Sequence, residues 1–69
     1  MNKLSARNQI KGTIVDVNKG ATTCHVRIDI GGGVIITASI TNQAAAELGL
    51  KAGTEAWAVI KASDVMIGV

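Results

Sequence analysis

The sequence predicts a small all-β protein in which five short strands form a barrel and one short helix joins two of them. Several runs rich in Val, Ile and Thr are bounded by glycine-containing turns, which is typical of strands. One run, from Thr23 to Ile30, alternates strictly between polar and apolar residues. A single alanine-rich stretch changes to a helical pattern between the third and fourth runs.

The first strand is predicted over residues 10–17, which read IKGTIVDV and end at the turn-like Asn18, Lys19 and Gly20. Gly12 within this run indicates a bend or a bulge. The second strand follows from Thr22. Cys24 and Val26 occupy its apolar face and His25 its polar face, so we expect one side of this strand to be buried.

Three glycines, residues 31–33, separate the second strand from a third run over residues 34–40. These two strands are predicted to form a hairpin, in which the glycines supply positive φ angles. Thr41 then has the right chemistry to cap a helix over residues 42–48. Gly49 fits the left-handed position beyond the end of that helix.

A fourth strand is predicted over residues 55–61, and a final extended stretch over residues 65–69 supplies the fifth. A helix between the third and fourth strands of a five-stranded antiparallel set is the layout of an OB barrel. The predicted fold class is therefore all-β, a small five-stranded OB-like barrel with one short helix. We expect residues 1–69 to form one domain, because no linker, internal repeat or low-complexity segment divides them.

The composition predicts self-association. A chain of 69 residues buries only about 60% of its unfolded surface, so a solitary core is marginal. Cys24 is the only cysteine, so no disulfide within the chain can add stability. Hydrophobic residues make up 48% of the chain, although Trp57 is its only aromatic residue. Such a chain leaves apolar surface exposed on the monomer, so we expect a homo-oligomer.

The sequence also restricts where the protein acts. No segment approaches the roughly 20 consecutive apolar residues needed to cross a bilayer, so no membrane partner is expected. The lone thiol agrees with a reducing compartment, and we expect a cytoplasmic location. The net charge of +2 is too small to identify a partner.

Two short segments near opposite ends of the chain carry donors suited to an oxyanion. Ser5, Ala6, Arg7 and Asn8 precede the first strand, and Lys61, Ala62 and Ser63 follow the fourth. A deprotonated tetrahedral dianion offers only acceptor oxygens, so its site needs N–H and O–H donors near fixed positive charge. Taken separately, these segments could also be a solvated lead-in, a strand-end lysine and a capping serine.

The same residues carry a family resemblance. Residues 5–9 (SARNQ), Lys11 with Gly12, and residues 59–66 (VIKASDVM) resemble the two motifs of the molbindin (Mop) family, small molybdate-binding proteins related to TOBE domains. The resemblance spans nearly the whole chain and implies a small OB-like barrel. It also implies a hexamer and the binding of molybdate, with tungstate as a competing ligand of similar size, charge and shape.

The resemblance implies site residues as well. Ser5, Ala6, Arg7, Asn8, Lys61, Ala62 and Ser63 would enclose the anion, with the two alanines acting through backbone N–H groups. Arg7 would either face the ligand or pair with a carboxylate and orient the loop. A second oxyanion site is suggested at Lys19, Gly20 and Ala21, where a turn between strands is the simpler interpretation. The implied role is storage, buffering or molybdenum homeostasis without a cofactor.

Other functions have weaker support in the residues. An OB-fold module for single-stranded nucleic acid is the main alternative, but such proteins need a basic groove and several stacking aromatics. A regulatory module detached from a transporter or transcription factor is a third possibility. No nucleophile with a base, paired carboxylates or metal-ligand cluster indicates an enzyme. Cys24 and His25 are adjacent in a strand, so they point to opposite faces and form no shared metal site.

Overall fold

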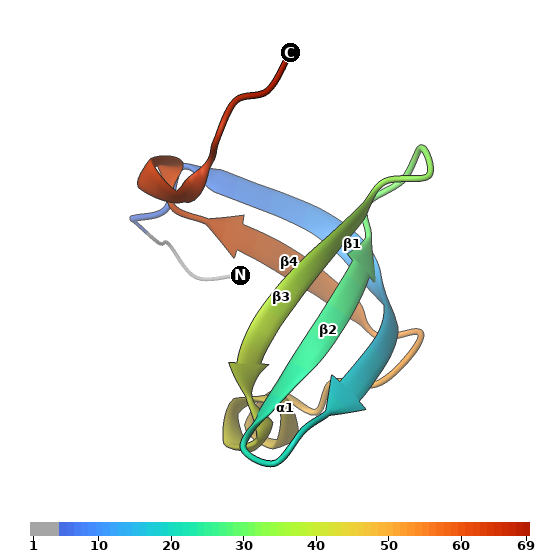
Figure 1. Cartoon of the computed structure of the whole chain (residues 1–69). Helices are drawn as coiled ribbons and strands as arrows, with labels where there is room; N and C mark the ends of the chain where they lie inside the picture. Colours follow the sequence, from blue (N-terminus) through green and yellow to red (C-terminus); the bar gives the residue numbers. More distant parts are fainter. Residues whose placement is uncertain (1–4) are drawn as a thin grey trace.

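The computed structural model describes residues 5–69 and shows a strongly curved antiparallel sheet with one short helix (Figure 1). The four strands run in the spatial order β3-β2-β1-β4. Their bounds are β1 Asn8–Lys19, β2 Thr23–Asp29, β3 Ile35–Thr41 and β4 Glu55–Ile60. The helix α1 covers Asn42–Leu48, and a 3₁₀ turn, η1, covers Ala62–Asp64.

The long strand β1 belongs to both halves of the sheet. Its first half pairs with β4, from Asn8 opposite Ile60 to Thr13 opposite Glu55. Its second half pairs with β2, and the register shifts between Ile14 and Asp16. The irregularity in β1 therefore lies at Val15 and not at Gly12, where a bend or bulge was expected. The increased twist of a bulge suits the bend in β1.

Gly12 is explained by a close approach to β2. A Cβ atom at this position would lie 2.6 Å from the backbone oxygen of Asp29 and 2.7 Å from a methyl carbon of Ile28. Only glycine lets the two strands come this close without a shift of the backbone.

The core lies on the concave side of the sheet, as the alternation in β2 predicted. Cys24, Val26 and Ile28 are buried on one face of β2, whereas His25 and Arg27 are exposed on the other. The other buried core residues among residues 5–69 are Ile14 of β1, Ala45 of α1 and Ala58 of β4. Cys24 is thus a core residue, as expected, and its thiol is free.

The helix and the hairpin confirm the turn chemistry read from the sequence. The hydroxyl of Thr41 accepts a hydrogen bond from the backbone N–H of Ala44 at 3.0 Å, and Gly49 adopts a left-handed φ of 65°. Residues 31–33 all have positive φ angles, between 62° and 99°. In residues 5–69, no helix is both long enough and apolar enough to cross a membrane.

The predicted fifth strand is wrong for this chain taken alone. Residues 65–69 form no strand, and the sheet is a four-stranded half-barrel that resembles an OB barrel with one position unfilled. The turn η1 directs the chain away from the sheet after Ile60, and the end of the chain projects outward (Figure 1). A β-branched sequence favours an extended backbone, but it becomes a strand only where a neighbouring edge is within reach.

Candidate functional site

The fold brings the two donor segments together at one end of the sheet. The 5–8 segment leads into β1, and the 61–63 segment follows β4 directly. Because β1 and β4 are antiparallel and Asn8 pairs with Ile60, the start of one strand lies beside the end of the other. Residues more than fifty positions apart in the sequence therefore share one surface region.

Asn8 ties the two segments together with its side chain. Its Nδ2 donates a hydrogen bond to the backbone oxygen of Ile60 at 3.2 Å, and the side chain is partly buried. The neighbouring Gln9 donates from Nε2 to the backbone oxygen of Ala6, also at 3.2 Å. Asn8 and Gln9 thus hold the shape of the 5–8 segment. The sequence motif predicted Asn8 as a ligand contact and did not indicate this structural role.

The 61–63 segment is shaped by the 3₁₀ turn. The backbone N–H of Asp64 donates to the oxygen of Lys61 at 2.9 Å, and that of Val65 donates to the oxygen of Ala62 at 3.3 Å. Within residues 5–69, the N–H groups of Ala62 and Ser63 form no backbone hydrogen bond. These two donors remain available at the start of the turn, as expected for the first residues of any helical turn.

The two cations of the site, Arg7 and Lys61, form no ion pair in the described part of the chain. The ion pairs found there join Lys11 to Glu55 and Arg27 to Asp16, so neither involves Arg7 or Lys61. The carboxylate of Asp64 is exposed and follows Ser63 directly in the sequence.

The site is open in a single copy of the chain. Ser5, Arg7 and the whole 61–63 segment are exposed, while Ala6 and Asn8 are half-buried. None of these residues lines the three main hollows of the part of the chain that the structure describes. An exposed donor set binds an anion weakly because water competes for every hydrogen bond, so a tight site here requires a further surface that covers it.

The second candidate site lies at the opposite end of β1. Lys19 and Gly20 line a shallow hollow of about 280 Å³, together with Asn18, Thr23 and His25. The N–H of Gly20 donates to the oxygen of Thr23 at 2.7 Å, and its own oxygen accepts from Nδ2 of Asn42 at 3.0 Å. Gly20 does not have a positive φ angle, so these contacts are those of a turn between strands.

Thr23 and His25 are the neighbours of Lys19 that sequence reasoning did not connect to this hollow. They arrive there because β1 and β2 form a hairpin, in which Asn18 pairs with His25 and Lys19 with Cys24. The hairpin register was the signal that could have found them. No group of three or more metal-ligating side chains occurs in the part of the chain that the structure covers.

Comparison with known proteins agrees with this geometry. The TOBE domain model matches residues 4–67. A probable molybdenum-pterin-binding protein of Haemophilus influenzae is 48% identical over 67 residues, which cover 97% of each chain. Among solved structures, MopII from Clostridium pasteurianum superposes with a TM-score of 0.90 at 46% identity, covering 97% of this chain and all of that one.

A further structure, the cytoplasmic molybdate-binding protein ModG with molybdate bound, gives a TM-score of 0.93 at 48% identity. The match covers 99% of this chain and 48% of ModG. The chain therefore belongs to the TOBE domain family and, within it, to the molbindin (Mop) group. The family resemblance read from the two sequence motifs is thus confirmed.

Proposed function

We propose that this chain binds molybdate between the 5–8 segment and the 61–63 segment. The pairing of Asn8 with Ile60 carries the proposal, because it joins two donor-bearing segments in a member of a family with molybdate-binding relatives. Ser5 and Ser63 would donate through hydroxyl groups, Ala6 and Ala62 through backbone N–H groups, and Lys61 would supply charge. The role is binding for storage, buffering or homeostasis, and no enzymatic step is involved.

The donor set explains which anions the site would select. At neutral pH phosphate retains a proton that requires an acceptor, whereas a fully deprotonated anion is satisfied by donors alone. Sulfate also lacks a proton, so the site must exclude it by size. Tungstate matches molybdate in charge and shape and is expected to compete for the same position.

We further propose that the site is completed in a homo-oligomer, for which the family resemblance implies a hexamer. The exposure of Ser5, Arg7 and the 61–63 segment in one copy supports this, since a second copy would exclude water from the anion. Residues 1–69 would act as one molbindin domain. A cytoplasmic location is supported by the relative ModG, which is described as a cytoplasmic protein.

The direct test is isothermal titration of the oxyanion-stripped protein with molybdate, with sulfate as the reference anion. Wild type is compared with the double variant Ser5→Ala, Lys61→Ala. Saturable heat is expected for molybdate and not for sulfate. Each charged hydrogen bond contributes about 1.5–3 kcal/mol, so the double variant should raise Kd by at least about tenfold.

Lys51→Ala is the matched control, because Lys51 is exposed in the turn before β4, outside both segments. It removes the same charge and should leave Kd unchanged. If molybdate gives no more heat than sulfate with folded wild-type protein, the proposal fails. The search would then move to macromolecular partners, beginning with single-stranded nucleic acid.

A further inference from the structure

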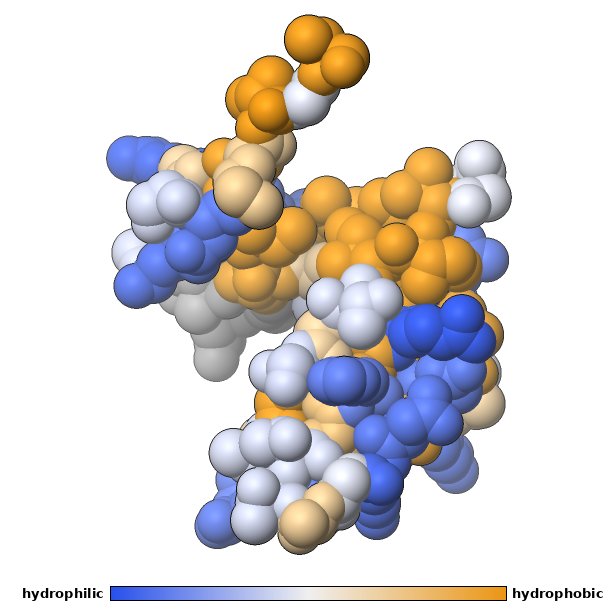
Figure 2. Space-filling model, viewed as in Figure 1, coloured by the Kyte–Doolittle hydropathy of each residue, from blue (hydrophilic) through white to orange (hydrophobic). Residues whose placement is uncertain are grey.

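Backbone carbonyls next to the two donor segments accept hydrogen bonds from within the chain; they belong to Ala6, Ile60, Lys61 and Ala62. The oxygen of Ala6 accepts from Nε2 of Gln9 and that of Ile60 from Nδ2 of Asn8, each at 3.2 Å. The other two accept backbone N–H groups at η1. Figure 2 shows hydrophilic residues over η1 and the start of β1, beside the apolar tail of residues 65–69. In this polar region, these acceptors are engaged by internal donors.

An occupied carbonyl changes which anions the neighbouring donors prefer. A free carbonyl oxygen beside a deprotonated dianion brings two acceptors together with no proton between them. The same oxygen beside hydrogen phosphate accepts the proton that phosphate retains at neutral pH. Internal hydrogen bonds to these carbonyls therefore favour a fully deprotonated anion over a protonated one.

An occupied carbonyl also fixes the direction of the N–H group that follows it. No cis peptide bond occurs in residues 5–69, and in a planar trans peptide the C=O and the next N–H point in opposite directions. The hydrogen bond from Gln9 to the oxygen of Ala6 therefore turns the N–H of Arg7 away from Gln9. In the described part of the chain this N–H forms no backbone hydrogen bond, so it is available to a ligand.

Gln9 reaches the oxygen of Ala6 from the exposed face of β1. Successive side chains of a strand point to opposite faces, and Asn8 is half-buried whereas Gln9 is exposed. The backbone of Gln9 is fixed by its pairing with Val59 of β4, while its side chain reaches back three residues along the chain. The carbonyl of Ala6 is thus controlled by a single exposed side chain, which can be changed without disturbing the core.

We propose that Gln9 is a positioning residue that sets the anion specificity of the site, acting through Ala6 and the N–H of Arg7 and not by touching the anion. Its amide occupies an acceptor that would otherwise favour hydrogen phosphate, and it holds the Arg7 N–H in the direction of a donor. The selected ligands are fully deprotonated tetrahedral dianions. This inference rests on the proposed oxyanion binding, and the hydrogen bond from Gln9 to Ala6 is its own observation.

The experiment is competition isothermal titration of the full-length protein with molybdate, sulfate and hydrogen phosphate. Wild type is compared with Gln9→Met, which keeps the side-chain length and removes the donor. The matched control is Gln43→Met, because Gln43 is exposed in α1, where its Nε2 donates to Oε1 of Glu47 at 3.2 Å. This control should leave the affinities for all three anions unchanged.

Gln9→Met should raise Kd for molybdate by about threefold to tenfold, which corresponds to the loss of one neutral hydrogen bond. The preference for molybdate over hydrogen phosphate should fall by about tenfold, because the freed oxygen of Ala6 accepts the phosphate proton. The preference for molybdate over sulfate should stay as in wild type, since neither anion carries a proton.

Two further variants separate this role from a purely structural one. Gln9→Lys retains an N–H donor at this position and should keep the wild-type preference for molybdate over hydrogen phosphate. Asp64→Asn removes the exposed carboxylate beside Ser63. In that background Gln9→Met should reduce the same preference, because the freed acceptor is the oxygen of Ala6.

The outcomes distinguish this inference from the proposed function. Wild-type protein that gives no saturable heat with molybdate would overturn oxyanion binding and the role of Gln9 together. Molybdate binding that Gln9→Met leaves unchanged, or weakens at constant preference over hydrogen phosphate, would overturn the role of Gln9 alone. An equal fall in the preference over sulfate would indicate a looser site and would also overturn it. Circular dichroism establishes that each variant is folded.

Discussion

At the residue scale, single side chains fix the local geometry that the candidate site needs. The amide of Asn8 joins the 5–8 segment to the end of β4 through the oxygen of Ile60. On the outer face of the sheet, Asp16 accepts hydrogen bonds from Nε of Arg27 at 3.0 and 3.1 Å and from Nδ2 of Asn18 at 3.2 Å. This second cluster lies beside the bulge in β1 and fixes the register of β1 against β2.

The Asp16 cluster makes stability depend on pH in a defined window. Hydrogen bonds from Arg27, helped by its charge, lower the pKa of Asp16 below its ordinary value of 3.8, against a smaller opposing effect of burial. A carboxylate with a lowered folded-state pKa contributes stability that is complete above its unfolded pKa and is lost as pH falls through the folded pKa. The stabilising effect of this pair should therefore be present at neutral pH and vanish in strong acid.

Arg27→Gln should lower the melting temperature at pH 7, and the difference from wild type should shrink as pH falls below about 4. Thermal unfolding between pH 2 and pH 7 measures this, with Lys51→Gln as the charge-matched control. A difference from wild type that stays constant across the whole range would show that the effect of Arg27 comes from packing and not from Asp16.

At the element scale, the stability of α1 comes from the capping of its two ends and from its packing, because the helix is short. Seven residues are too few for a helix to be stable alone, so capping and packing must support it. Thr41 caps its start, Gly49 ends it, and Ala45 is buried against the sheet. Asn42 also connects the helix to the turn after β1, because its backbone N–H donates to the oxygen of Thr22 at 2.9 Å.

Removing the cap should destabilise the domain measurably. Thr41→Ala leaves the N–H of Ala44 without its partner, and the expected loss is about 1 kcal/mol in the free energy of unfolding. Thr41→Ser keeps the hydroxyl and should retain most of the stability. Urea unfolding of both variants gives the comparison, and equal losses would mean that the threonine methyl group, and not the cap, stabilises this region.

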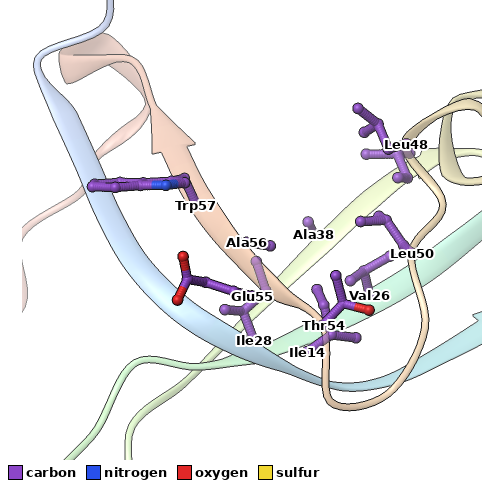
Figure 3. Close-up of a pocket in the computed structure, with 11 residues that line it drawn as sticks. Ile14, Val26, Ile28, Ala38, Leu48, Leu50, Thr54, Glu55, Ala56 and Trp57 are labelled. Atoms are coloured by element: carbon purple, nitrogen blue, oxygen red, sulfur yellow. The ribbon is translucent and has the colours of Figure 1, made fainter. Parts of the chain in front are cut away.

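At the scale of the whole molecule, the half-barrel is incomplete in two related ways. Apolar hollows lined by Ala38, Ile40 and Trp57 are open between β3 and β4 (Figure 3). The donors of the 5–8 and 61–63 segments are exposed beside the start of β1 and the end of β4. In the homo-oligomer proposed above, a further copy of the chain would cover the donor segments. An anion that binds only the assembled, folded state would then stabilise fold and assembly together.

Molybdate should therefore raise the melting temperature in a concentration-dependent manner. At a free ligand concentration of 100 times Kd, the expected stabilisation is about 2.7 kcal/mol per site. Differential scanning calorimetry with molybdate, sulfate and phosphate at equal ionic strength provides the measurement. Equal shifts with all three anions would reduce the effect to nonspecific salt.

Local features of this protein follow from the sequence alone. Strict alternation in β2 predicted the buried Cys24 and Val26, because the side-chain period of a strand is two. Thr41 and Gly49 predicted both ends of α1, because caps act over a few residues. The Ser5 and Lys61 motifs identified the family before any geometry was known.

Only the tertiary structure decided how distant parts meet. The β1 and β4 register placed the 5–8 and 61–63 segments together, and no local pattern encodes a pairing across fifty residues. The tail shows the same limit. Its sequence made residues 65–69 suitable for a strand, but a strand needs an edge to pair with, and η1 turns the tail away from the edges of its own sheet. Periodicity and capping are properties of neighbouring residues, whereas pairing depends on which surfaces the folded chain leaves free.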